Sequence, residues 1–225
     1  MYFPVPMQAI DPRRNTSLPT ANLCLILLNV LAFLLLDPAG WWVGPGTGLF
    51  SLLSYGFVHN GVWHLIFNMW FLWVIGNAVN RRIGNGHYLL LYLGTIVFLG
   101  IWARLFSPYF LLGSSGAIFA VMAAAALLLP AARVLVHYLA VFPVTILMGL
   151  LHRPEYGLFW IIRWGSTRLA MIVLVLSFVV LETCVLAFWG LNWSSLGHLA
   201  GLVCGVGIVL LMPAEITMGY SSKTI

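Results

Sequence analysis

The sequence predicts an all-α membrane protein whose helices cross a bilayer six times. Of its 225 residues, 62% are hydrophobic and only 7% are charged, whereas a soluble domain needs far more charge to cover its surface. The apolar residues form six continuous runs, each near the roughly 20 residues that a spanning helix needs. Runs of this length and continuity favour helices over barrel strands. The predicted spans are 20–36, 57–79, 88–106, 113–130, 169–189 and 196–212.

Prolines and basic residues define the ends and the orientation of these spans. Pro108, Pro130 and Pro213 lie at or just beyond the ends of the third, fourth and sixth runs, where proline is typical. With the N-terminus in the cytoplasm, only Arg104 among the 10 basic residues lies outside, which is a strong positive-inside bias. The basic residues expected inside are Arg13, Arg14, Arg81, Arg82, Arg133, Arg153, Arg163, Arg168 and Lys223. We therefore expect an integral protein of a cell (inner) membrane with both termini cytoplasmic.

The chain has room for one membrane unit and two short tails. We expect a cytoplasmic tail over 1–19, the six-span unit over 20–212 and a second cytoplasmic tail over 213–225. The net charge of +5 follows from the asymmetry across the membrane and does not indicate a nucleic-acid partner. The expected partners are the lipid bilayer and other membrane proteins, and the oligomeric state stays open.

Segment 131–168 is expected to be a cytoplasmic loop that lies against the membrane. Trp160 and Trp164 would then lie at the depth of the lipid headgroups. Its stretch 134–151 is almost apolar enough to cross the bilayer. A crossing there would move the following three arginines outside and abolish the charge bias, so a loop is the preferred interpretation.

Polar residues inside three spans indicate a shared site. The second run carries His59, His64 and Asn68. The fourth run begins with Gly-Ser-Ser-Gly at 113–116, and the sixth with Ser-Ser-Leu-Gly-His at 194–198. All three spans are expected to run from outside to inside, so at about 1.5 Å of rise per residue these groups share the outer third of the bilayer. Polar groups are costly there unless they are paired or used, and one functional site is the economical explanation.

These residue types predict acyl-transfer chemistry. A serine hydroxyl becomes an effective nucleophile when a neighbouring base accepts its proton, so Ser115 and His198 are the candidate catalytic pair. The developing oxyanion needs hydrogen-bond donors. His64 and Asn68 are four residues apart and share one helix face, so with the Ser115 N–H they are the expected donors. Gly113 completes this oxyanion and substrate-binding group, because glycine lets a backbone turn tightly and approach a substrate.

Other hydrolytic mechanisms lack the residues that they need. The single lysine, Lys223, lies in the tail, and Asp11 and Asp37 lie outside the spans. No H-E-x-x-H motif occurs and the three cysteines lack metal-ligand spacing, so no metal and no cofactor is expected. Glu182 is the one acidic residue within a span. It could orient His198, line a water-filled cavity or bond a neighbouring helix; a structural or gating role is preferred, and the predicted catalytic unit is a dyad.

Three short motifs occur in order along these spans. Residues 59–68 fit the pattern H-x4-H-x3-N, residues 113–117 fit G-x-S-G-A, and residues 197–205 fit small-H-x2-G-x3-G. Together they resemble the motifs of the rhomboid family of intramembrane serine proteases. The resemblance covers about 50–212 and implies a six-helix rhomboid bundle with a Ser–His dyad. It also implies that the substrates are transmembrane helices, which unwind near the outer face and enter laterally beside the fifth span.

The resemblance also implies roles for residues around the dyad. His59 is expected to hold a loop or cap in a supporting role, and direct contact with the oxyanion is the less favoured alternative. Phe119 occupies the position where the family places an aromatic ring against the histidine. Gly116, Gly201 and Gly205 are expected to let helices four and six approach closely.

The sequence departs from the family pattern in its loops. The first outer loop has tryptophans at 41–42 without the usual arginine, and Asn80 replaces a common glutamate. These differences affect loop packing and substrate preference and leave the chemistry intact. Two alternatives remain: a catalytically silent rhomboid-like binder of membrane helices, and a small transporter. The presence of both serine and histidine, and the lack of clear paired repeats, favour the protease.

Overall fold

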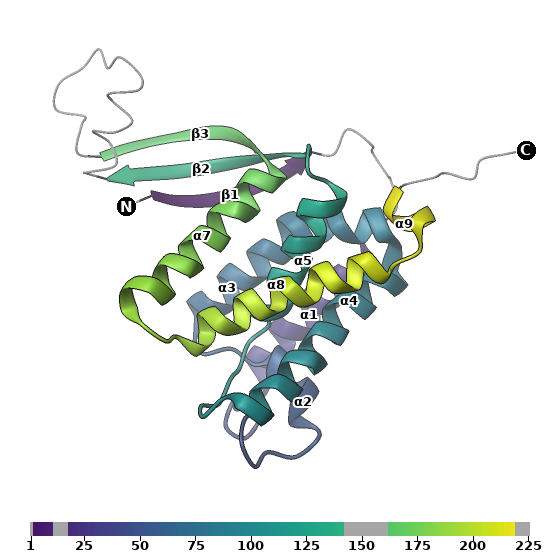
Figure 1. Ribbon diagram of the computed structural model, residues 1–225, viewed down its shortest axis with the longest axis vertical. Coiled ribbons are helices and arrows are strands. Elements are labelled where there is room, and N and C mark those ends of the chain that lie inside the picture. The colour runs from purple at the N-terminus through teal and green to yellow at the C-terminus, as the bar shows by residue number, and fades with distance from the viewer. Residues whose placement is uncertain (1, 11–17, 142–161, 219–225) are drawn as a thin grey trace, which may run out of the picture.

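The computed structural model describes residues 2–10, 18–141 and 162–218. The chain is mostly helical, with a small antiparallel sheet at one end of a helical bundle (Figure 1). The elements are β1 (Tyr2–Ile10), α1 (Thr20–Leu35), α2 (Ser51–Ser54), the 3-10 helix η1 (Tyr55–Phe57), α3 (Val62–Phe71), the π-helix η2 (Leu72–Gly76), α4 (Asn77–Phe106), α5 (Ser115–Leu128), β2 (Arg133–Val141), β3 (Ile162–Ala170), α7 (Met171–Trp189), α8 (Trp193–Leu211) and α9 (Ala214–Met218).

Several of these helices have the length and composition of membrane spans. Among the described residues, three helical stretches are long and apolar enough to cross a membrane: Val62–Phe106, Met171–Trp189 and Trp193–Leu211. The helices α1 and α5 are apolar but shorter. The first stretch is broken at Gly84, where φ is 79° and ψ is 167°, a conformation that only glycine adopts readily. This break separates the predicted second and third spans.

The two segments on either side of Gly84 lie antiparallel. The Tyr55 hydroxyl donates a hydrogen bond of 2.8 Å to the Ile96 carbonyl. Gly76, much nearer the break, lies against Tyr88, whose hydroxyl would be 2.6 Å from a Cβ at that glycine. The chain therefore turns back on itself at the break and forms a helical hairpin.

A buried asparagine ties α1 to this hairpin. The Asn22 amide nitrogen donates to the Leu72 carbonyl at 2.8 Å and to the Asn77 side-chain oxygen at 2.9 Å. Asn22 is fully buried, and a buried amide of this kind needs such partners. Because Leu72 begins the π-helical turn, this contact fixes α1 at the point where the regular helix is interrupted.

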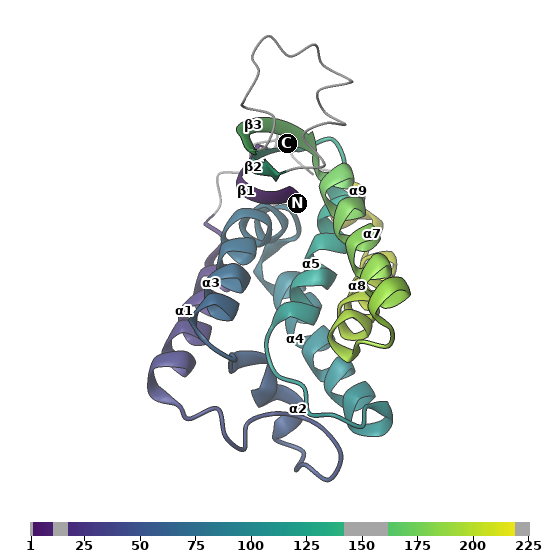
Figure 2. The same ribbon diagram turned by 90° about the vertical axis from the view of Figure 1, so that its left-hand side faces the viewer.

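Helix α5 lies at the centre of the bundle and α8 packs directly against its backbone. All residues from 117 to 126 are buried, and α5 lies between α3 and α8 in Figure 2. A Cβ at Gly201 would lie 2.1 Å from the Gly116 carbonyl oxygen, and one at Gly205 would lie 2.5 Å from that of Ala120. The two helices approach so closely that no side chain fits between them at these points.

The three-stranded sheet is absent from the all-α prediction, which is wrong in this part of the chain. β2 pairs antiparallel with both β1 and β3, in the order β1-β2-β3. The loop predicted over 131–168 therefore begins and ends in strands. Val134 and Val136 of β2 are fully buried, as suits β-branched side chains on a pleated surface. Their backbone groups find partners in the distant N-terminal strand, a pairing that no local pattern indicates.

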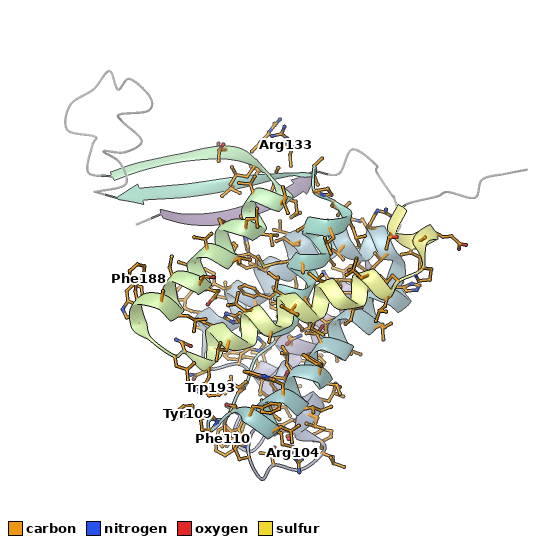
Figure 3. All side chains as sticks on the ribbon, viewed as in Figure 1. Arg104, Tyr109, Phe110, Arg133, Phe188 and Trp193 are labelled. Atoms are coloured by element: carbon orange, nitrogen blue, oxygen red, sulfur yellow. The ribbon has the colours of Figure 1, made fainter. Side chains whose placement is uncertain are left out.

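The membrane contact predicted for this segment is not tested. Residues 142–161, including Trp160, lie outside the described residues, and the headgroup position of Trp164 stays a prediction. The sheet lies at the end of the bundle where α5 ends and α7 begins (Figure 1). Figure 3 shows Arg133 at this end of the molecule and Arg104 at the opposite end.

Candidate active site

The first residue of α5 and the sixth residue of α8 form the centre of the site. The Ser115 Oγ and the His198 Nε2 are 2.9 Å apart. The start of α8 is fixed by Asn192, whose side-chain oxygen accepts hydrogen bonds from the backbone N–H groups of Ser194 and Ser195 at 2.9 and 3.3 Å. This is a standard N-cap, and it sets the position of the histidine one turn further on. A hydroxyl and an imidazole at this distance have the geometry of a nucleophile and its base.

An aromatic ring lies flat against the imidazole. The rings of Phe119 and His198 are parallel within 2°, with centroids 4.5 Å apart. Phe119 lies one turn after Ser115 on α5, so the same helix carries the candidate nucleophile and the ring that stacks on His198. Phe178 of α7 contacts Phe119 edge-on at 6.4 Å and Phe71 of α3 at 5.3 Å. The plane of the imidazole is therefore set by packing that involves three helices.

The second nitrogen of the imidazole contacts a carboxylate. The His198 Nδ1 lies 2.7 Å from Oε1 of Glu182 on α7. The two side chains are only 18% and 13% exposed. A carboxylate accepts the Nδ1–H, which leaves the Nε2 lone pair facing the Ser115 hydroxyl. Three roles were considered for Glu182, and this contact corresponds to the one in which it orients His198.

The predicted oxyanion donors lie on α3. A Cβ at Gly113 would be 2.7 Å from Cε1 and 3.0 Å from Nε2 of His64, so this imidazole faces the backbone just before Ser115. The His64 Nδ1 accepts a hydrogen bond from the Asn60 N–H, which places the hydrogen of a neutral ring on Nε2. Within the described residues, the buried Asn68 amide nitrogen has no hydrogen-bond partner. A buried unpaired donor costs about 1–3 kcal/mol, so a ligand oxygen would satisfy it.

The loop before Ser115 is held by His59 and by a glycine. The His59 Nε2 lies 3.3 Å from the Ser114 Oγ, and its ring packs edge-on against His64 at 5.0 Å. The Gly113 N–H donates to the Tyr55 carbonyl at 2.8 Å. Gly113 has φ of 103°, a value that disfavours any residue with a Cβ. His59 thus contacts the residue next to the nucleophile and not the nucleophile itself.

Sequence reasoning did not single out two residues that shape the site. Phe178 links α7 to the ring that supports His198, and Asn192 caps α8. A signal for Phe178 was present, since it lies four residues before Glu182 and shares a helix face with it. Asn192 could have been found as a good N-cap residue before an apolar run.

The described residues offer no obvious metal site. They contain no group of three or more His, Cys, Asp or Glu side chains that could hold a metal ion. Cys24, Cys184 and Cys204 are free thiols. The absence of a cofactor stays a prediction from the sequence.

The fold and the site together define a class of protein. Among the described residues, a bundle that includes three helical stretches long and apolar enough to cross a bilayer brings a serine, a histidine and a carboxylate into hydrogen-bonding contact. The family model described as the Rhomboid domain matches residues 46–215 of this chain. The chain belongs to the rhomboid family and is an integral membrane protein, which confirms the resemblance inferred from the three motifs.

Several curated proteins are similar to part of the chain. Rhomboid protease GluP of Bacillus subtilis is 36% identical over 121 residues, which are 47% of this chain and 24% of that protein. Rhomboid protease GlpG of Photorhabdus laumondii is 27% identical over 111 residues, 45% of this chain and 39% of that protein. The mitochondrial rhomboid protein 1 of Saccharomyces cerevisiae is 33% identical over 105 residues, 44% of this chain and 30% of that protein. The chain thus spans less than half the length of each of these relatives.

Proposed function

We propose that this protein is an intramembrane serine endopeptidase, which hydrolyses peptide bonds in or near the transmembrane helices of other membrane proteins. The observation that carries the proposal is the 2.9 Å distance between the Ser115 Oγ and the His198 Nε2. Two of the relatives named above are rhomboid proteases, which supports the same activity.

The reaction begins when the Ser115 Oγ attacks the scissile carbonyl carbon and passes its proton to the His198 Nε2. The carbonyl oxygen becomes an oxyanion and accepts hydrogen bonds from the Ser115 N–H, the His64 Nε2–H and the Asn68 amide. The C–N bond then breaks as the imidazolium gives its proton to the leaving amine. Water, deprotonated by His198, hydrolyses the acyl-enzyme ester and releases the serine.

The depth of the site fits cleavage within the membrane. Helix α5 has 14 residues, so at 1.5 Å of rise it is about 21 Å long and shorter than the roughly 30 Å of a hydrocarbon core. A helix this short, starting at Ser115, leaves the nucleophile below the membrane surface when its other end reaches the opposite face. Water must then enter from the nearer face, because the bilayer centre has none.

The proposed topology has six crossings, with both termini in the cytoplasm of a cell (inner) membrane. The break at Gly84 divides the longest apolar stretch into two crossings, and α1, α5, α7 and α8 supply the others. The positions of Arg133 and Arg104 at opposite ends of the bundle support this orientation (Figure 3), because Arg104 is the one basic residue expected outside. Substrate helices would enter beside α7.

The test is cleavage of a panel of type I membrane proteins co-expressed with this chain. Wild type is compared with Ser115→Ala and His198→Ala, and with the matched controls Ser194→Ala and His87→Ala. Ser194 is exposed on α8, and His87 lies on α4 outside the site. Cleavage that is lost only with the first pair supports the proposal. Cleavage that survives Ser115→Ala or His198→Ala would reject it and favour a different nucleophile.

A further inference from the structure

We propose that Glu182 is a positioning residue for His198, so that this protein works with a Ser–His–Glu unit in place of a dyad. The inference rests on the proposed function and adds a third member to its catalytic unit. The observation behind it is the 2.7 Å contact between the Glu182 Oε1 and the His198 Nδ1, on the side of the ring opposite Ser115.

The surroundings of Glu182 make an incidental contact a poor explanation. Its neighbours on α7, Val180 and Leu181, are 60% and 55% exposed, so they lie on the outer surface of a helix that is apolar enough to span a membrane. The Glu182 carboxylate instead turns inward to α8, where His198 meets it. An ionised side chain in a span is costly unless it is paired, and here its partner is the base of the proposed reaction.

The contacts hold the imidazole on three sides. Glu182 meets Nδ1, Ser115 meets Nε2, and Phe119 covers one face of the ring. When the carboxylate accepts the Nδ1–H, the neutral ring is locked in the tautomer whose Nε2 can accept the Ser115 proton. After that transfer, both nitrogens carry hydrogen, and the carboxylate stabilises the imidazolium without taking a proton itself. The atoms and protons of the dyad mechanism are unchanged.

The position of α7 then controls how well the base is oriented. The buried residues of α7 are Met171, Leu174 and Val175, all in its first five positions. Beyond these positions, α7 contacts the bundle through the Phe178 ring and through the bond between Glu182 and His198. The carboxylate is in place only while the part of α7 that bears Glu182 packs against α8.

The kinetic test compares Glu182→Gln and Glu182→Asp with the control Thr183→Val, in purified protein with a fluorescent transmembrane substrate. Thr183 is exposed next to Glu182 and bonds only its own helix at Val179. Loss of the carboxylate in Ser–His–Asp enzymes costs about 10⁴-fold; since Phe119 still supports the ring here, we expect kcat to fall about 10- to 100-fold, with KM within about twofold. Glu182→Asp should recover part of the loss, and Thr183→Val should match wild type.

Two further readouts separate positioning from general damage. The rate at which a fluorophosphonate labels Ser115 should fall in Glu182→Gln by the same factor as kcat, because the probe needs an activated serine and no substrate helix. In micelles, the His198 Nδ1–H proton of the wild type should resonate far downfield; His198→Ala should remove this signal. The NMR experiment needs no Glu182 variant, so it decides even if those variants fold poorly.

The outcomes distinguish this proposal from the proposed function. Wild-type kcat and labelling in Glu182→Gln, with Ser115→Ala inactive, would reject the role of Glu182 and leave the dyad intact. A wild-type spectrum without the downfield proton would also reject it, whatever the kinetics. Cleavage by Ser115→Ala would instead overturn the proposed function on which it rests.

Discussion

Helices α8 and α7 both contribute to the histidine site, but they are attached to the bundle in opposite ways. α8 meets α5 backbone to backbone at Gly201 and Gly205, and it carries the base. α7 contacts the site through two side chains: Phe178, which packs on Phe119, and Glu182, which bonds His198. Ser115 and His198, the proposed nucleophile and base, therefore lie on two helices that pack backbone to backbone, whereas Glu182 lies on a helix whose buried residues are all in its first five positions. This difference supports the proposal that α5 and α8 carry the catalytic pair and that α7 orients the base.

The largest expected effect comes from a substitution that forces α5 and α8 apart. A Cβ at Gly201 would overlap the Gly116 carbonyl, whereas Gly207 on the same helix has nothing within 4 Å. Gly201→Val should abolish cleavage and lower the free energy of unfolding by about 1–3 kcal/mol or more. Gly207→Val should retain both the cleavage activity and the free energy of unfolding of the wild type. Proteolysis assays and thermal unfolding in detergent measure the two effects. An active, stable Gly201→Val would show that the site does not depend on the close packing of α5 and α8.

A substitution on α3 should affect the rate of the reaction without disturbing the packing of α7 or α8. Asn68→Leu removes a buried amide that lacks a partner among the described residues, so we expect the melting temperature to stay or rise. Loss of an oxyanion donor should lower kcat about 10²- to 10³-fold. If kcat falls less than about tenfold, Asn68 does not contact the oxyanion.

A smaller effect is expected from the ring that supports the base. Phe119→Leu keeps an apolar side chain, slightly smaller than phenylalanine, but removes the stacking on His198, and such aromatic contacts contribute about 0.5–1.5 kcal/mol. We predict a fall in kcat of about 2- to 10-fold, and a steeper fall when Glu182→Gln is also present. A double-mutant cycle on kcat measures this coupling; strictly additive effects would mean that the two contacts do not hold the same ring.

The smallest effect should come from loosening α7. Phe178→Leu weakens the edge contacts with Phe119 and Phe71, whereas Phe188 is 78% exposed at the end of the same helix (Figure 3). We expect a roughly 2-fold fall in the rate of fluorophosphonate labelling for Phe178→Leu, at the low end of aromatic pair energies. Phe188→Leu should label like wild type. Equal rates in all three proteins would argue that α7 does not influence the base.

The sequence is informative where function depends on local spacing. The three motifs point to Ser115, His198 and His64 as candidate site residues, because polar groups are conspicuous in apolar runs, and the structure brings Ser115 and His198 together. The Glu182 contact could not be predicted with the same clarity, since it depends on the rotation of α7 relative to α8. The sheet could not be predicted because β2 is completed by a strand more than one hundred residues earlier, and strand pairing at that range leaves no local pattern.

The proposed activation of Ser115 by His198 can be tested by covalent labelling of the serine. Purified wild type is treated with a fluorophosphonate, and the adduct is located by peptide mass spectrometry. We predict a single adduct on Ser115, which is absent in Ser115→Ala and formed at least about 100-fold more slowly in His198→Ala. An adduct on another serine would show that Ser115 is not the nucleophile. Equal labelling rates in wild type and His198→Ala would show that His198 does not activate it.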